Sequence, residues 1–241
     1  MERKTLKEVL SHVKKIGFKP KTIIDVGVAY GTPSLYGVFD DVKYLLVDPL
    51  REYENVMRDI CSKYPGEYVV AAAGDMPGSM TLNVHPDLSG SSFYKESEGS
   101  HVDGEPREVP VITLDDLIKE KQAEGPYILK VDTQGAELNV LAGASEVLKQ
   151  TEVVLLEVFL FQFYKNIPLF YDIISFMKER GFVAYDIFGG HYRPFDNALA
   201  QVDIAFAQEK GFFRKTNFFA TKEQRKEFTE KRIKVLNPKL G

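Results

Sequence analysis

Short apolar segments rich in β-branched residues alternate with stretches of helical periodicity along most of the chain. The apolar segments read TIIDVG, VKYLLVDP, EYVVAAAGD, YILKVDTQG, EVVLLEVF, FVAYDIFGG and QVDIAFAQ, and REYENVMRDICSKY, GAELNVLAGASEVLKQ and PLFYDIISFMKERG have helical spacing. This alternation is typical of a parallel sheet with helices on both faces. The last two apolar segments are joined by HYRPFDNALA instead of a helix, which predicts an antiparallel last strand. We therefore predict an α/β fold with a seven-stranded, mostly parallel sheet.

The chain of 241 residues is long enough to bury a sizeable core, and no break in composition divides it. We predict a single domain over residues 1–241. Apolar residues at helical spacing predict an N-terminal helix over residues 5–16, with Gly17 just beyond its end. A polar insertion over residues 75–107 is predicted to form a lid or a surface loop. Alternating charges from Thr221 onwards predict a solvent-exposed helix.

Composition excludes several kinds of partner. The formal charge of −4 gives no general attraction to nucleic acid. No uninterrupted apolar run is long enough to cross a bilayer, so we expect no stable membrane insertion. The single cysteine, Cys61, cannot form an internal disulfide, which fits a reducing compartment. We expect a cytoplasmic protein, and the apolar GFF at residues 211–213 leaves a homodimer open.

The first predicted strand ends on an acid and runs into the glycine-containing loop DVGVAYG. In open α/β sheets, ligands bind outside the carboxyl ends of the strands, and Gly27 and Gly31 would let a backbone pass close to one. The next strand also ends on an acid, Asp48, about 20 positions after Gly27, which is the spacing of a ribose-binding carboxylate. Asp25 and Asp48 together suggest an adenosine site, although a tight turn alone would also explain the glycines.

The type of nucleotide cofactor follows from what the loop lacks. GVAYG has no middle glycine for a pyrophosphate, and the chain has no Gly-Lys-Ser/Thr of a Walker loop. A carboxylate at position 25 would repel phosphate but suits a ligand with ammonium and sulfonium charges. S-adenosylmethionine is such a ligand.

Four segments resemble the FkbM-type methyltransferases, which are similar to other class I S-adenosylmethionine-dependent enzymes. IIDVGVAYGT, LLVDP, VPVITLDDLI and ILKVDTQGAELNVLAGA resemble that family's motifs in their order along the chain. The resemblance implies a Rossmann-like class I methyltransferase fold, S-adenosylmethionine as the cofactor, S-adenosylhomocysteine as the product, and methyl transfer, usually to oxygen. Tyr30 stands where the family tends to have asparagine, which puts one side-chain contact of the loop in doubt.

The cofactor site is predicted from the strand ends and from the resemblance. Asp25 would orient the loop or accept hydrogen bonds from the methionine end, and Asp48 would accept both ribose hydroxyls or cap the next helix. Asp75 would bond the adenine amine or belong to a simple turn. The predicted cofactor-binding residues are Asp25, Gly27, Ala29, Tyr30, Gly31, Asp48, Pro49, Ala73, Gly74, Asp75, Ser92 and Asp132.

The catalytic candidates are Asp132, Glu157 and His191, because a carboxylate or imidazole near the acceptor could take the hydroxyl proton. Mg²⁺ could position the acceptor on carboxylates, but no binding loop is evident and no metal is predicted. Phe161 and Tyr164 could line the acceptor site, although aromatic clusters are more often core.

The function favoured by the sequence is S-adenosylmethionine-dependent O-methylation of a hydroxyl on a sugar, nucleotide-sugar or glycan precursor. A polyketide, a peptide or another secondary metabolite is the alternative acceptor. A nucleotide-binding oxidoreductase and a catalytically inactive binding module are alternatives from other classes. The glycine that GVAYG lacks relative to a dinucleotide-binding loop argues against the oxidoreductase. The acids retained at the strand ends argue against the inactive module.

Overall fold

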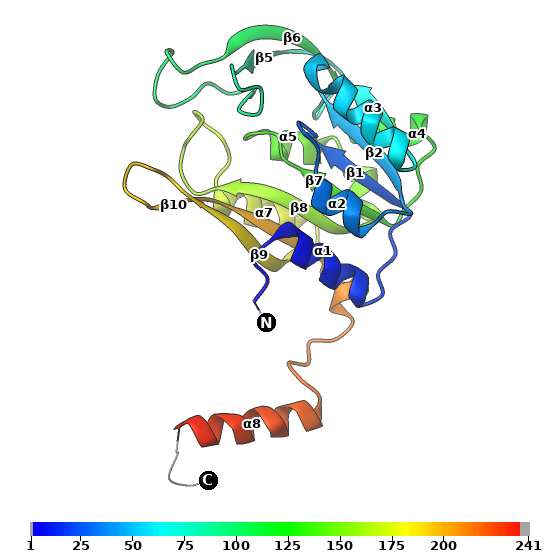
Figure 1. Cartoon of the computed structure of the whole chain (residues 1–241), viewed down its shortest axis with the longest axis vertical. Helices are drawn as coiled ribbons and strands as arrows, with labels where there is room; N and C mark the ends of the chain where they lie inside the picture. Colours follow the sequence, from blue (N-terminus) through cyan, green and yellow to red (C-terminus); the bar gives the residue numbers. More distant parts are fainter. Residues whose placement is uncertain (1, 237–241) are drawn as a thin grey trace.

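The main sheet of the computed structural model, which describes residues 2–236, has seven strands in the order β3-β2-β1-β7-β8-β10-β9 (Figure 1). All neighbouring pairs are parallel except those made by β10, which is antiparallel to both β8 and β9. The prediction of a seven-stranded, mostly parallel sheet with an antiparallel last strand is confirmed. The strands are β1 (Thr22–Val26), β2 (Lys43–Asp48), β3 (Gly66–Val70), β7 (Tyr127–Val131), β8 (Thr151–Phe159), β9 (Phe182–Tyr192) and β10 (Leu199–Gln208).

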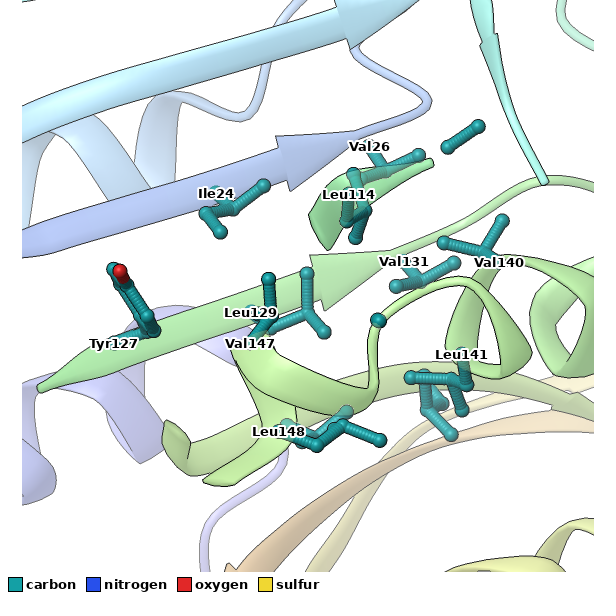
Figure 2. Close-up of a cluster of buried hydrophobic side chains, with 14 of the residues drawn as sticks. Ile24, Val26, Leu114, Tyr127, Leu129, Val131, Val140, Leu141, Val147 and Leu148 are labelled. Carbon is teal, nitrogen blue, oxygen red and sulfur yellow. The ribbon is translucent and has the colours of Figure 1, made fainter. Parts of the chain in front are cut away.

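Helices cover both faces of this sheet, so its central strands are buried on both sides. One face packs against α1 (Leu6–Lys15), α2 (Pro33–Val38) and α3 (Glu54–Lys63), which follows the 3-10 turn η1 (Arg51–Tyr53). The opposite face packs against α4 (Leu114–Glu120), α5 (Glu137–Ala142), α6 (Ser145–Lys149) and α7 (Phe170–Glu179). Figure 2 shows this second core, in which residues of β1 and β7 meet α4, α5 and α6.

The N-terminal helix begins where the sequence predicts it. Thr5 caps α1 and forms a capping box with Glu8, in which each side chain bonds the other residue's backbone N–H. Gly17 follows the helix with φ of 93°, a left-handed conformation that favours glycine.

A second, three-stranded sheet occupies part of the predicted insertion. Its strands are β4 (Ala72–Ala73), β6 (Glu105–Ile112) and β5 (Gly78–Val84), in that spatial order. EYVVAAAGD, predicted as one strand, therefore divides between β3 of the main sheet and β4 of the small sheet. Figure 1 shows the small sheet and its long loop at one end of the main sheet, above the carboxyl ends of β1 and β7.

The predicted helix GAELNVLAGASEVLKQ is also divided, into α5 and α6, at Gly143. A Cβ at Gly143 would lie 2.0 Å from the carbonyl oxygen of Gly74, so the close approach of the small sheet requires glycine there. The predicted exposed helix is α8 (Lys222–Leu236), which buries no residue and stands away from the domain after η2 (Phe212–Arg214) (Figure 1). Among residues 2–236, no helix combines the length and apolar character needed to cross a membrane.

Candidate functional site

Five adjacent strands of the main sheet each carry a carboxylate in, or directly after, the strand. In sheet order these strands are β2, β1, β7, β8 and β10. Asp25 of β1 is in register with Lys130 of β7, and Glu157 of β8 is in register with Asp203 of β10. Because the carboxyl ends of parallel strands form the ligand crevice of an open α/β sheet, we place the candidate site at this edge. The five carboxylates belong to Asp48, Asp25, Asp132, Glu157 and Asp203.

Asp25 is fully buried and anchors the loop that follows β1. The Tyr36 hydroxyl donates to its Oδ2 over 2.6 Å, and the Lys130 ammonium lies 3.3 Å from its Oδ1. Lys130 also donates to the carbonyl of Gly27 over 2.7 Å. Burial opposes the charge of Lys130, but Asp25 and Asp132 raise its pKa, so the ammonium form is retained. Of the two roles predicted for Asp25, this geometry supports orientation of the loop.

The loop after β1 lies tightly against the end of β7. Gly27 has φ of 75°, and a Cβ built there would lie 1.8 Å from the backbone oxygen of Asp132. Gly31 has φ of 94° and Ala29 has φ of 46°, so the turn is left-handed at three positions. The Ala29 N–H donates to Asp48, the last residue of the neighbouring strand β2, over 2.9 Å.

A cavity of about 140 Å³, which we call the inner cavity, lies between this loop and the ends of β2 and β4. Asp48 lines it, and each of its oxygens accepts one backbone N–H over 2.9 Å, Oδ2 from Ala29 and Oδ1 from Leu50. Burial raises the pKa of Asp48, and these two hydrogen bonds oppose the shift. Since each carboxylate oxygen can accept a second hydrogen bond, Asp48 can cap the turn and still bind a hydroxyl in the cavity.

The rest of the inner cavity is mostly apolar, and Ala73 lies in its wall as predicted. The predicted residues Gly74 and Asp75 do not line it; Asp75 is exposed to solvent. Ser92 is buried behind the wall, where its hydroxyl donates to the Gln134 carbonyl over 2.6 Å. The flat aromatic faces of an adenine in this cavity would contact Pro49, Leu50, Tyr53, Ala72, Leu82 and Phe93.

A second cavity of about 340 Å³, the loop cavity, adjoins the inner one and shares Gly27, Ala29 and Asp132 with it. The predicted residues Tyr30 and Gly31 line this second cavity. The two cavities form an elongated site with an apolar slot at one end, Asp48 in the middle and an acidic end. The apolar slot fits the adenine of S-adenosylmethionine, and Asp48 fits its ribose. The acidic end fits its positively charged methionine end.

Asp132 and Glu157 are brought together by a side-chain amide. The Gln134 Nε2 donates to Oδ1 of Asp132 over 3.1 Å and to Oε2 of Glu157 over 3.0 Å. Gln201 of β10 donates to the other oxygen of Glu157. Both carboxylates line the loop cavity, and Gln134 lines the inner one. The amide bridge thus fixes two of the three predicted catalytic residues next to the cofactor site.

Burial, followed by the charges of Asp132, Glu137 and Asp203, raises the pKa of Glu157 well above its ordinary value. Burial and Asp132 also raise the pKa of Asp203 to about 7. A carboxylate with a raised pKa is a stronger base than an ordinary one. Within residues 2–236, no group of three or more His, Cys, Asp or Glu side chains has an arrangement that could hold a metal ion.

His191, the third predicted catalytic residue, lies apart from the carboxylate pair. It is exposed on β9 and lines a cleft of about 970 Å³, which we call the outer cleft. Phe161 lines the same cleft, and Tyr164 does so while its hydroxyl lies 3.2 Å from Oε1 of Gln134. Gln134 is thus common to the outer cleft and the inner cavity.

Sequence reasoning missed Gln134, Gln201 and Asp203. Gln134 lies between Asp132 and Gly135, in a motif that the sequence assigns to the site. Its place in that motif could have identified it as a site residue. Gln201 and Asp203 are alternate polar residues at the start of an otherwise apolar strand, which places both on one side of it.

Comparison with solved structures finds methyltransferases at low sequence identity. Magnesium protoporphyrin IX methyltransferase from Synechocystis, crystallised with S-adenosylmethionine, has 10% identity and a TM-score of 0.46 over 84% of this chain and 79% of its own. Precorrin-6y C5,15-methyltransferase from Geobacter metallireducens has 12% identity and a TM-score of 0.43 over 83% and 86%. An rRNA methylase from Streptococcus thermophilus has 8% identity and a TM-score of 0.45 over 84% and 93%.

No curated protein sequence matches the chain. The family model described as the methyltransferase FkbM domain matches residues 25–184, from the carboxylate of β1 into β9. The matched range contains the loop after β1, Asp48, the Asp132–Gln134 segment and Glu157. The chain therefore belongs to the FkbM methyltransferase family, a class I family whose cofactor is S-adenosylmethionine.

Proposed function

We propose that this methyltransferase acts on oxygen and methylates a hydroxyl of a sugar, nucleotide-sugar or glycan precursor. The observation that carries the proposal is the pair of carboxylates, Asp132 and Glu157, which line the loop cavity and are joined by Gln134, a residue that also lines the inner cavity and the outer cleft. A hydroxyl must lose its proton during or after attack on the methyl group, and a positioned carboxylate can accept that proton.

The cofactor supplies an electrophilic methyl group on a sulfonium, and the protein has to align it with the acceptor. In the proposal, Asp48 binds the ribose hydroxyls and Asp132 faces the positively charged methionine end of the cofactor. Glu157 is the proton acceptor, held by Gln134 and Gln201. His191 contacts the acceptor from the outer cleft.

Titration calorimetry tests the cofactor part of the proposal. We expect S-adenosylmethionine and S-adenosylhomocysteine to bind, NAD not to bind, and Mg²⁺ to change neither affinity. Asp48→Ala should weaken binding at least tenfold, because a charge-assisted hydrogen bond contributes about 1.5–3 kcal/mol. Asp48→Asn, which keeps an acceptor for the Ala29 or Leu50 N–H, is the control for folding. Binding of NAD alone, or an unchanged affinity in Asp48→Ala, would contradict the assignment.

Transfer of an isotope-labelled methyl group tests the chemistry. We expect the label on an oxygen of the acceptor, identified by the chemical shift of the new methyl group in NMR. A label on nitrogen or carbon would overturn O-methylation while leaving the cofactor assignment intact.

A further inference from the structure

The outer cleft is larger than either cavity of the cofactor site and opens beside them. Three segments form it: the loop of the insertion, the turn after β8 and the β9–β10 hairpin. It shares Ser89 and Gln134 with the inner cavity. Gln134 also donates to both Asp132 and Glu157, so a molecule bound in the outer cleft would lie beside the residue that joins the carboxylate pair.

Aromatic side chains form one wall of the cleft. Phe195 at the tip of the β9–β10 hairpin is 90% exposed, and Phe163 in the turn after β8 is 45% exposed. Phe163 stacks on Phe159 at 6.3 Å with an interplanar angle of 6°. Phe161 supports the guanidinium of Arg193, whose carbon lies 4.1 Å from the ring centroid. Large apolar rings left exposed beside a cavity are suited to stacking on a ligand ring.

The charges around the cleft disfavour an anion. Among the described residues that line it, Arg193 is the one lysine or arginine. Its guanidinium binds both carboxylate oxygens of Asp196, at 2.7 and 2.6 Å, and this pair lowers the pKa of Asp196 to about 2. Two carboxylates belong to the lining: Glu98, and Asp87, whose Oδ1 lies 2.9 Å from Nδ1 of His85. A phosphate in the cleft would meet these acids and a guanidinium that is already paired.

The lining also supplies uncharged hydrogen-bonding groups. Gln162 and Gln201 contribute amides, and Ser89 and Ser97 contribute hydroxyls. Gln201 also donates to Glu157, so a hydroxyl bound beside it would lie near the proposed proton acceptor. A ligand with one apolar face and several hydroxyls matches this combination of surfaces.

We propose that the outer cleft binds the acceptor as an uncharged, hydroxyl-bearing ring stacked on Phe195, with Phe161 and Phe163 in the same lining, and that it rejects acceptors carrying phosphate. The inference rests on the proposed function and narrows it, because it removes nucleotide-sugars and other phosphorylated precursors from the acceptors. Neutral saccharides remain.

Saturation-transfer NMR tests the proposal on the full chain without needing turnover. The probes are cellotriose and chitotriose, with UDP-glucose and UDP-N-acetylglucosamine as their phosphate-bearing counterparts. Saturating S-adenosylhomocysteine keeps nucleotides out of the inner cavity, and pH 8 keeps ordinary imidazoles neutral. We expect at least one trisaccharide to bind at least tenfold more tightly than its UDP-linked counterpart. Tighter binding of the UDP-sugars, or no binding of either trisaccharide, would overturn the proposal.

Two variants locate the binding. Phe195→Ala should weaken trisaccharide binding at least fivefold, whereas Phe218→Ala, which removes a side chain 87% exposed outside the cleft, should leave it unchanged. Asp196→Asn releases Arg193 and should increase the affinity for the UDP-sugars. Equal binding in Phe195→Ala and the parent protein would overturn the stacking. Calorimetry with S-adenosylmethionine measures the cofactor site separately. Cofactor binding without saccharide binding would contradict only the inference about the outer cleft, whereas loss of cofactor binding would contradict the proposed function.

Discussion

The cofactor half and the acceptor half of the site are built from different kinds of contact. In the cofactor half, formed by the ends of β1, β2 and β7, buried charged side chains hold the backbone of the loops that follow the strands. Asp48 accepts the N–H groups of Ala29 and Leu50, and Lys130 donates to the Gly27 carbonyl. In the acceptor half, formed around β8, β9 and β10, uncharged amide side chains hold a carboxylate, as Gln134 and Gln201 do with Glu157.

This difference indicates which half of the site can change its shape and chemistry by substitution. A backbone loop held by buried charges has one conformation, and glycine is required where it approaches β7. A wall of exposed aromatic and amide side chains can change its shape and chemistry by single substitutions without altering the sheet. In the proposed assignment, the fold thus separates a fixed site for the cofactor from an adaptable site for the acceptor.

Gly27→Ala should have the largest effect on stability and cofactor binding, because it places a side chain in the loop of the cofactor half. The added Cβ would lie 1.8 Å from the backbone oxygen of Asp132, and a φ of 75° strains any side chain. We expect a loss of unfolding free energy of about 4 kcal/mol or more and no measurable cofactor binding. Gly37→Ala in α2 is the control: its Cβ meets no atom within 4 Å, so stability should be unchanged or higher. Equal stability of the two variants in urea unfolding would show that the loop can relax.

Glu157→Gln should separate the two halves functionally. Loss of the proton acceptor should lower kcat by about 100-fold or more. The affinity for S-adenosylmethionine should fall by less than about tenfold, because Glu157 is one of several acids of the loop cavity while Asp48 and the loop after β1 are untouched. In the parent protein, kcat should rise with pH through a value above the ordinary range of glutamate, following the raised pKa of Glu157. Full activity in Glu157→Gln would assign the proton transfer to another group.

Two buried tyrosines allow the halves to be compared by one chemical change. Tyr36→Phe removes the donor to the buried carboxylate of Asp25 and should cost about 2–3 kcal/mol of unfolding free energy. Tyr164→Phe removes a hydroxyl that lies 3.0 Å from the Gly90 carbonyl, a neutral partner, and should cost about 1 kcal/mol. Denaturant unfolding measures both values. A larger loss in Tyr164→Phe than in Tyr36→Phe would show that the stronger tyrosine hydrogen bond lies in the acceptor half.

Asp203 should make the acceptor half sensitive to pH. Its folded-state pKa of about 7 lies above the ordinary value, so the protonated form stabilises the folded protein. That contribution is fully present below about pH 4 and is lost as the pH rises through 7. Relative to Asp203→Asn, which stays neutral, the parent protein should lose about 3 kcal/mol of unfolding free energy between pH 4.5 and 8. A difference that does not change with pH would show that the folded protein holds no proton on Asp203.

The smallest effect is expected outside both halves. Phe228 of α8 is 52% exposed and contacts Phe219 at a ring distance of 6.2 Å. Phe228→Ala should change the unfolding free energy by less than about 0.5 kcal/mol and leave kcat unaltered. A larger loss would reveal that α8 packs against a surface in solution.

The cofactor half was predictable from the sequence because its signals are local. Asp25, Asp48 and Asp132 each end an apolar run, and a strand end can be recognised within a few residues of it. The family motifs lie on the same segments. The order of the sheet followed from the alternation of strands and helices, and from the missing helix before the last strand.

The acceptor half was not predictable because it is assembled by contacts between distant segments. The outer cleft requires the insertion to meet the turn after β8, as the bridge between Glu96 and Tyr164 shows. The same limit explains the divided elements of the fold. The passage of the chain from β3 to β4 depends on pairing with β6, and the break at Gly143 depends on the carbonyl of Gly74.

The order of the strands also bears on how the protein is completed during synthesis. The main-sheet strands of the cofactor half, β1, β2, β3 and β7, are all made by Val131. The last strand made, β10, lies between β8 and β9, and β9 pairs with no other strand of the main sheet. Since a chain emerges from the ribosome N-terminus first, β9 must wait unpaired until Leu199–Gln208 is available. A nascent chain thus has the strands of the cofactor site before Gln201 arrives to hold Glu157 and complete the acceptor site.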